Sequence, residues 1–115
     1  MVCGAALAFG ALVTGCQSPW IACTVVNHQS APVFLVEVNY PGGSFGVQTI
    51  APGGTFRYRF HSLSTDMVSV DFTDAAHKSH TVKGPRLLQR QEGTLQIEIE
   101  PDNKVSWTPV LKNAP

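Results

Sequence analysis

Alternation of apolar and polar side chains is the feature that most restricts what this sequence can fold into. It is strictest at residues 55–61, TFRYRFH, which place three aromatic rings on one side and two arginines on the other. Successive side chains of a β-strand point to opposite faces, whereas a helix repeats every 3.6 residues. The same alternation recurs in Phe34, Val36, Val38 and Tyr40, in Val68, Val70 and Phe72, and in Leu95, Ile97 and Ile99. We therefore predict strands that bury one face.

Clusters of Pro, Gly, Asn and Asp separate these segments and predict turns, as at residues 41–43, 51–54 and 101–103. No amphipathic helix is expected. The pattern predicts about eight strands, at residues 21–28, 33–40, 44–50, 55–61, 66–73, 78–83, 94–100 and 104–109. Alternation on one face favours an all-β fold, an antiparallel two-layer sandwich, over a parallel sheet, whose strands are apolar on both faces. A small closed barrel would show the same pattern.

The chain has 115 residues, enough for one domain, and 43% of them are hydrophobic, enough to form a core. Its eight basic residues balance its eight acidic ones. Nucleic acid is therefore not an expected partner, because no net field attracts phosphates.

An apolar run at residues 5–13 is too short to cross a bilayer, which takes about 20 residues, and is typical of a signal peptide. It ends in Val13-Thr14-Gly15-Cys16. These four residues resemble the lipobox of bacterial lipoproteins, in which the cysteine is diacylated and becomes the mature N-terminus. The resemblance implies a lipid on Cys16 and an extracytoplasmic domain anchored in the cell envelope. In the alternative, the run is a buried strand or helix and Cys16 is a small core residue.

No Lys or Arg precedes the apolar run, although lipoprotein signals carry one there; a misplaced start codon would explain the difference. Gln17, directly after the cysteine, implies delivery to the outer membrane if the source is Gram-negative. We predict a signal peptide at 1–15, a tether at 16–20, a sandwich at 21–110 and a tail at 111–115.

Cysteine usage fits this organisation. Cys3 would leave with the signal and Cys16 would be acylated, so Cys23 remains alone and no disulfide is expected. Cys23 lies in an apolar strand and is expected to fill space in the core. The turn at 27–30 and the turn at 51–54, which leads into an aromatic strand, resemble immunoglobulin-like sandwich modules of secreted bacterial proteins. Antibody domains are excluded, because they need a second cysteine for the bridge between their sheets.

Residues that could carry chemistry do not form a recognisable site. The histidines are His28, His61, His77 and His80, and the aspartates considered are Asp66, Asp71 and Asp74. His77 and His80 would point to opposite faces of a strand, whereas zinc needs convergent ligands. Asp74 is expected to bond its own turn at 73–76, and none of these aspartates lies in a glycine-containing calcium loop. We expect no metal site and no cofactor.

Serines at 44 and 64 lie outside the glycine-flanked elbow that exposes a catalytic serine. The chain is therefore not expected to be an enzyme; a hydrolase would require a cleft with clustered titratable groups.

Two pairs of residues are candidates for binding. Tyr40 and Phe45 flank a glycine-rich loop, and Arg57 and Arg59 lie on the polar side of one strand; aromatic residues and arginine often anchor interfaces. Alternatively, Tyr40 and Phe45 cap the core, and the arginines face cross-strand carboxylates such as Glu98 or keep the edge of a sheet soluble. The expected function is a membrane-anchored envelope lipoprotein with a non-catalytic binding or scaffolding module, which binds another envelope protein. The alternative is a membrane-tethered inhibitor or small-ligand carrier, and a carrier needs a concave apolar pocket.

Overall fold

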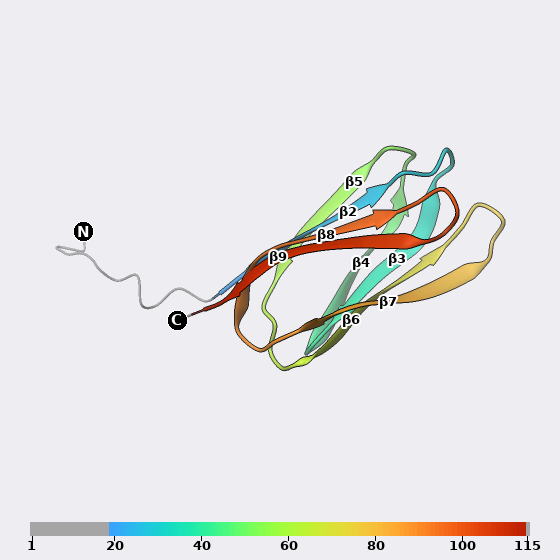
Figure 1. Ribbon diagram of the computed structural model, residues 1–115. Coiled ribbons are helices and arrows are strands. Elements are labelled where there is room, and N and C mark those ends of the chain that lie inside the picture. The colour runs from blue at the N-terminus through green and yellow to red at the C-terminus, as the bar shows by residue number, and fades with distance from the viewer. Residues whose placement is uncertain (1–18, 115) are drawn as a thin grey trace.

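The computed structural model describes residues 19–114, which form two facing four-stranded sheets (Figure 1). Within this range there is no helix, and the predicted all-β two-layer sandwich is confirmed. The strands are β2 (Ile21–Asn27), β3 (Val33–Tyr40), β4 (Gly43–Ile50), β5 (Thr55–Phe60), β6 (Asp66–Thr73), β7 (Ser79–Leu87), β8 (Gln91–Ile99) and β9 (Val105–Asn113). The predictions for Cys3, Cys16, Gln17 and the signal segment lie outside the described residues.

One sheet has the strand order β5-β2-β8-β9 and the other has the order β4-β3-β6-β7. Neighbouring strands are antiparallel except β2 and β8, which run parallel from Ile21 opposite Gly93 to Asn27 opposite Ile99. The architecture is a two-layer β-sandwich whose strand order differs from that of antibody constant domains, which place the first, second, fifth and fourth strands in one sheet. Alternation could not predict the parallel pair, because it specifies which face is buried and not the direction of the partner.

The core lies between the sheets and follows the alternation, most regularly in β2, where every second residue is buried. Its sixteen buried members are Ile21, Cys23, Val25, Val33, Val36, Val38, Phe45, Ile50, Phe60, Val68, Val70, Phe72, Leu87, Leu95, Ile97 and Ile99. Strand β3 departs from the prediction. Its pairing with β6 shifts between Phe34 and Glu37, and Leu35 between them has a positive φ of 51° and is exposed. As a result Val33 is buried, while Phe34 is only half-buried.

Two strands extend beyond their predicted ends. β7 was predicted to stop at residue 83 but continues to Leu87, because Gly84 and Pro85 form a bulge opposite Val68. An edge strand tolerates proline, which cannot donate a ladder hydrogen bond. β9 likewise continues through Pro109 to Asn113, so the predicted tail at 111–115 is wrong for residues 111–113. Leu111 packs against the core, which explains the extension.

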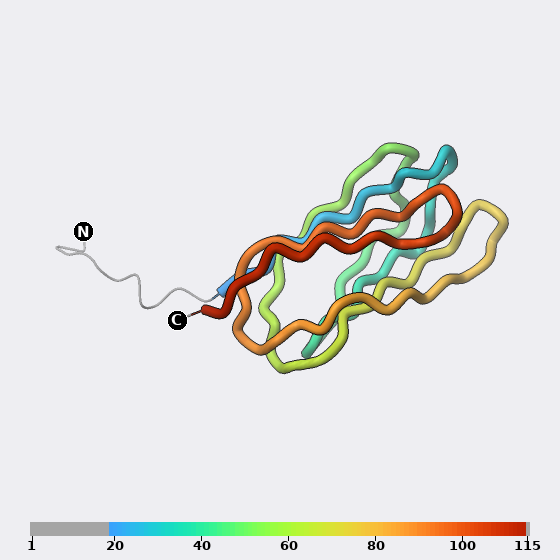
Figure 2. The backbone as a smooth tube through the Cα atoms, in the orientation of Figure 1, coloured from blue at the N-terminus to red at the C-terminus, as the bar shows by residue number. Residues whose placement is uncertain are grey.

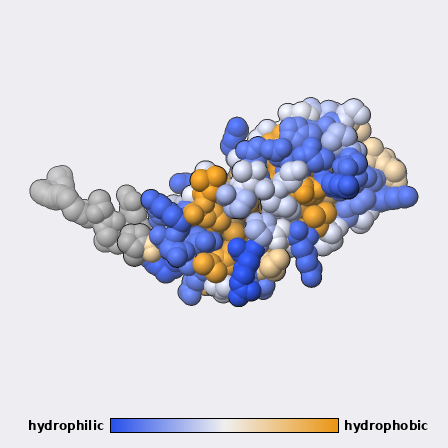
Figure 3. All heavy atoms as spheres, in the orientation of Figure 1, coloured by the Kyte–Doolittle hydropathy of each residue, from blue (hydrophilic) through white to orange (hydrophobic). Residues whose placement is uncertain are grey.

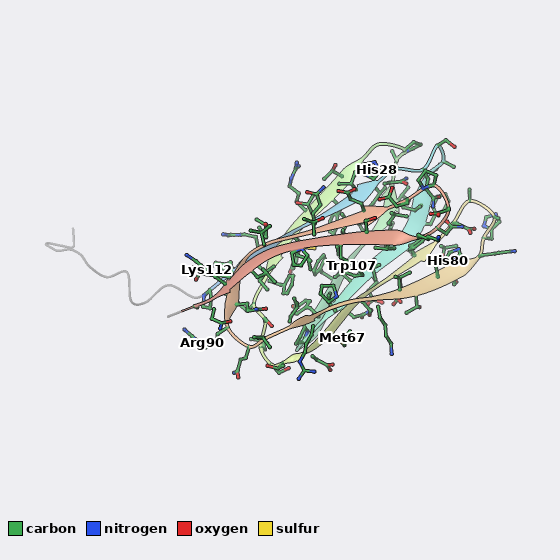
Figure 4. All side chains as sticks on the ribbon, viewed as in Figure 1. His28, Met67, His80, Arg90, Trp107 and Lys112 are labelled. Atoms are coloured by element: carbon green, nitrogen blue, oxygen red, sulfur yellow. The ribbon has the colours of Figure 1, made fainter. Side chains whose placement is uncertain are left out.

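The chain enters β2 and leaves β9 at the same end of the sandwich (Figure 2). We call this the proximal end; it is formed by residues 19–20, 41–42, 61–67, 86–93 and 110–114. The distal end, at the other end of the strands, is formed by the turns at residues 28–32, 51–54, 74–78 and 100–104. Figure 4 shows Arg90 and Lys112 at the proximal end and His28 and His80 at the distal end.

Candidate functional site

Five aromatic rings gather between the two sheets on the side where β4 and β5 form the edges. Phe45 is the centre of this group: its ring centroid lies 4.5 Å from that of Tyr58 and 5.8 Å from that of Phe60. Tyr40 and Phe56 complete the group, each with its ring centroid 6.0 Å from that of Phe45. Phe45 is buried with 8% of its surface exposed, whereas Tyr58 is 48% exposed. The aromatic group therefore reaches the surface at Tyr58.

The sequence builds this group from three strands, with Tyr40 as the last residue of β3. Phe56, Tyr58 and Phe60 alternate along one side of β5, and Phe45 lies on β4. Tyr40 stacks on Phe60 at 4.2 Å and covers its cross-strand partner Gly43, where a Cβ would lie only 2.7 Å from the phenol oxygen. Tyr40 and Phe45 therefore contact the core and cap the sandwich. This was the alternative to their forming an exposed binding loop.

Arg57 and Arg59 are exposed on β5, as the alternation predicted. The expected carboxylate partner is wrong, because Glu98 lies on β8 and pairs instead with His28 at 3.3 Å. Arg59 places its guanidinium 4.7 Å from the centroid of the Trp20 ring, a cation–π contact. Arg57 lies opposite Thr24 of β2. In the part of the chain that the structure describes, neither arginine forms an ion pair.

We call Arg57, Tyr58 and Arg59 the β5 surface. β5 pairs with β2 on one side only, so backbone N–H and C=O groups along its other side have no strand partner. A shallow hollow beside it is lined by residues 22–24 and 57–59. Sequence reasoning missed Tyr58, because alternation assigns its side chain to the core face and cannot show that this face opens at the sheet edge.

Cys23 is a packing residue, as predicted. Only 2% of its surface is exposed, and desolvation by burial raises the pKa of its thiol to about 12. A thiol that stays protonated at neutral pH is a poor nucleophile.

Asp74 bonds its own turn, as predicted. One carboxylate oxygen accepts hydrogen bonds from the backbone N–H groups of Ala76 and Lys78, at 2.9 and 3.0 Å. The other lies 2.7 Å from Nε2 of His80 and accepts a bond from the side-chain amide of Asn103. The bond from His80, followed by that from Lys78, lowers the pKa of Asp74 below its ordinary value of 3.8. This cluster joins two distal turns and therefore has a structural role.

The other titratable residues do not converge. His77 is exposed with a positive φ of 64°, while His80 stacks on Phe72. Asp71 accepts hydrogen bonds from Asn39 and Thr81, and Asp66 accepts one from the backbone of Met67. Among residues 19–114, no three His, Cys, Asp or Glu side chains are placed to hold a metal ion. The same range contains no helix that is long and apolar enough to cross a membrane.

Comparison with known proteins gives a fold and no family. No family model matches the sequence, and no curated protein is similar to it. A solved structure, described as an NMR structure of a protein from Eubacterium rectale, superposes with a TM-score of 0.56 at 16% identity. The match covers 85% of this chain and 93% of that protein. At this level of identity the likeness shows a shared sandwich fold alone.

Proposed function

We propose that this chain is an envelope lipoprotein, held at a membrane by lipid on Cys16, whose sandwich binds another envelope protein through the β5 surface. The observation that supports binding most directly is an exposed tyrosine flanked by two arginines without ion pairs on an open edge strand. The module is non-catalytic in this proposal.

The anchor is supported by the residues Val13 to Cys16 and by the start of the domain soon after them. Only Gln17 and Ser18 separate Cys16 from Pro19, the first described residue. Each buried methylene of an acyl chain contributes about 0.8 kcal/mol, so several chains on one residue hold a small domain firmly.

Binding through the β5 surface is supported by side-chain type and by pre-organisation. Tyrosine and arginine are enriched among the residues that dominate interface energies. Tyr58 is already stacked on the buried Phe45, so ordering it in a complex costs little side-chain entropy. The open edge of β5 also offers backbone groups to a strand of a partner.

The anchor is tested with Cys16→Ser. We expect this variant to lose labelling by radioactive palmitate and to leave the membrane fraction, while Cys23→Ala, which changes a buried cysteine, keeps both. Unchanged labelling and fractionation of Cys16→Ser would exclude the anchor.

Binding is tested by affinity purification from detergent-solubilised envelope. We expect one stoichiometric protein partner whose recovery falls at least about tenfold with Tyr58→Ala, the loss typical of an interface anchor. Arg57→Gln should also weaken recovery. Lys83→Gln, an exposed change on the edge strand β7, is the control and should have no effect. Equal recovery with all three variants would refute the β5 surface as the binding site, and a co-purifying small molecule instead would favour a ligand carrier.

A further inference from the structure

Large exposed apolar side chains are concentrated at the proximal end. Single exposed apolar residues are normal on any protein, but a group of them marks an interaction surface. Seven such residues occur in the described chain, and all but Leu35 and Tyr58 lie at or next to this end: Trp20, Leu63, Met67, Leu88 and Val110, with 40% to 66% of their surface exposed. Figure 3, in the orientation of Figure 1, shows apolar side chains in orange toward the end of the sandwich at which β2 begins.

Charged side chains are also distributed unevenly between the two ends of the sandwich, although the whole chain is neutral. The proximal end and the strand residues next to it carry four cationic side chains, Arg59, Arg86, Arg90 and Lys112, against two acidic ones, Asp66 and Glu92. The distal end and the strand residues next to it carry the cationic Lys78 and Lys104 against the acidic Asp74, Glu98, Glu100 and Asp102. The apolar group therefore lies among an excess of positive charge.

Backbone hydrogen bonds tie the proximal segments into one surface. The N–H of Leu63 donates to the carbonyl of Pro41 at 3.1 Å, and that of Arg90 donates to Ser62 at 3.0 Å. The N–H of Ala114 in turn donates to Arg90 at 2.9 Å. On the other side, Trp20 accepts a bond from Gly93 at 3.1 Å, and its ring lies 3.7 Å from that of His61. The backbone segments that form the proximal end are thus joined to one another.

The position of the anchor determines what this surface meets. Three residue steps from Cys16 to Pro19 span at most about 10 Å. If lipid on Cys16 is inserted in a bilayer, the proximal end lies within that distance of the headgroups. The distal end is separated from the proximal end by strands of up to nine residues, roughly 30 Å.

We propose that the proximal end rests directly on a bilayer containing anionic phospholipids, a proposal that depends on the lipid anchor of the proposed function. Trp20 and the apolar side chains of the loops lie at headgroup level, where tryptophan is enriched in membrane proteins. Arg86 and Arg90 face the phosphates, while Lys112 pairs with Glu92 at 3.5 Å. In this orientation the strands extend away from the membrane. The distal end is farthest from the bilayer, and the β5 surface lies on the side of the sandwich.

The first experiment measures depth in the lipid-anchored protein. The described chain has one tryptophan at the proximal end and a second, Trp107, within β9 (Figure 4). Phospholipids with brominated acyl chains should quench the fluorescence of Trp20 in Trp107→Phe. They should leave that of Trp107 unquenched in Trp20→Phe. Absence of quenching in Trp107→Phe, with palmitate labelling intact, would overturn the membrane contact while the anchor stands.

The second experiment does not need the anchor. In a Cys16→Ser background, we compare co-sedimentation with vesicles of phosphatidylcholine, alone or mixed with phosphatidylglycerol. Arg86→Gln with Arg90→Gln should reduce binding to the anionic vesicles by about thirtyfold. Lys78→Gln with Lys104→Gln removes the same charge from the distal end and should not. Both double variants keep the apolar segment at residues 5–13, so any contribution of this segment to vesicle binding is the same in the two.

The outcomes separate the two proposals. Equal binding of the two double variants would overturn the surface. A difference between them, together with a wild-type protein that radioactive palmitate does not label, would support the surface and exclude the lipid anchor.

Discussion

Replacing Asn27 by alanine should destabilise the sandwich more than any other single change of a polar side chain to alanine. Asn27 is completely buried at the end of β2. Its amide nitrogen donates to the carbonyls of Ala31 and Ile50 at 2.9 and 3.0 Å, with a longer contact to Ala51, and its oxygen accepts from the backbone of Gln29 at 2.8 Å. It therefore joins the β2–β3 and β4–β5 turns.

The cost follows from these bonds. Asn27→Ala removes three good hydrogen bonds at about 1 kcal/mol each and leaves a buried carbonyl without its partner, so the free energy of unfolding should fall by about 3 kcal/mol. For a domain of this size that corresponds to a melting temperature lower by about 12 to 24 °C. Urea denaturation should show a lower midpoint with an unchanged slope.

Two further variants separate the hydrogen bonds from the shape of the side chain. Asn27→Asp keeps the shape but turns an acceptor toward the carbonyls, so it should be at least as destabilising as alanine. Asn113→Ala, at the exposed end of β9, should change stability by less than about 0.5 kcal/mol. A loss below about 1 kcal/mol in Asn27→Ala would refute this account.

Gly84, Cys23 and Asp74 provide three further predictions. A Cβ on Gly84 would lie 2.6 Å from the indole of Trp107, so Gly84→Ala should cost about 1 to 3 kcal/mol in urea denaturation, and Trp107→Leu should recover part of it; equal stability would contradict the contact. The thiol of Cys23 has a pKa of about 12, against an ordinary 9.0. It should therefore react with iodoacetamide about a thousandfold more slowly in the native than in the denatured protein, as measured by peptide mapping. Rates within tenfold of each other would contradict its burial. Because the pKa of Asp74 is lowered in the fold, its carboxylate stabilises the protein above pH 3.8 and loses this effect as the pH falls. The melting temperature should therefore decline more steeply below about pH 4 in the wild type than in Asp74→Asn. Parallel curves would contradict the bond to His80.

The sequence predicted most of the fold because alternation is a local property. Strands β3 and β6 have the predicted bounds, 33–40 and 66–73, and every other predicted strand exists. The errors arise where the partner strand decides the outcome. The shift in β3, which exposes Leu35, and the bulge that carries β7 past Pro85 depend on register with β6.

The candidate site was harder to predict for the same reason. Tyr40 and Phe45 were selected because they flank a loop, but facing strands enclose them. Tyr58 shares a strand side with the buried Phe60, and only its place at the open edge leaves it exposed. The proximal apolar group comes from segments distant in sequence, so no local pattern reveals it.

The parallel pair of β2 and β8 has a consequence for the time at which the protein folds. Ile21 of β2 pairs with Gly93 of β8, so β2 cannot complete its sheet until a segment about seventy residues later in the chain is present. Contacts of such high sequence separation slow folding, since long loops must close first. Until β8 emerges, β2 has only β5 as a partner, and a lone two-stranded ribbon is marginal in water. The sheet that contains β2 therefore cannot be completed, and the sandwich cannot close, until nearly all of the chain has been made.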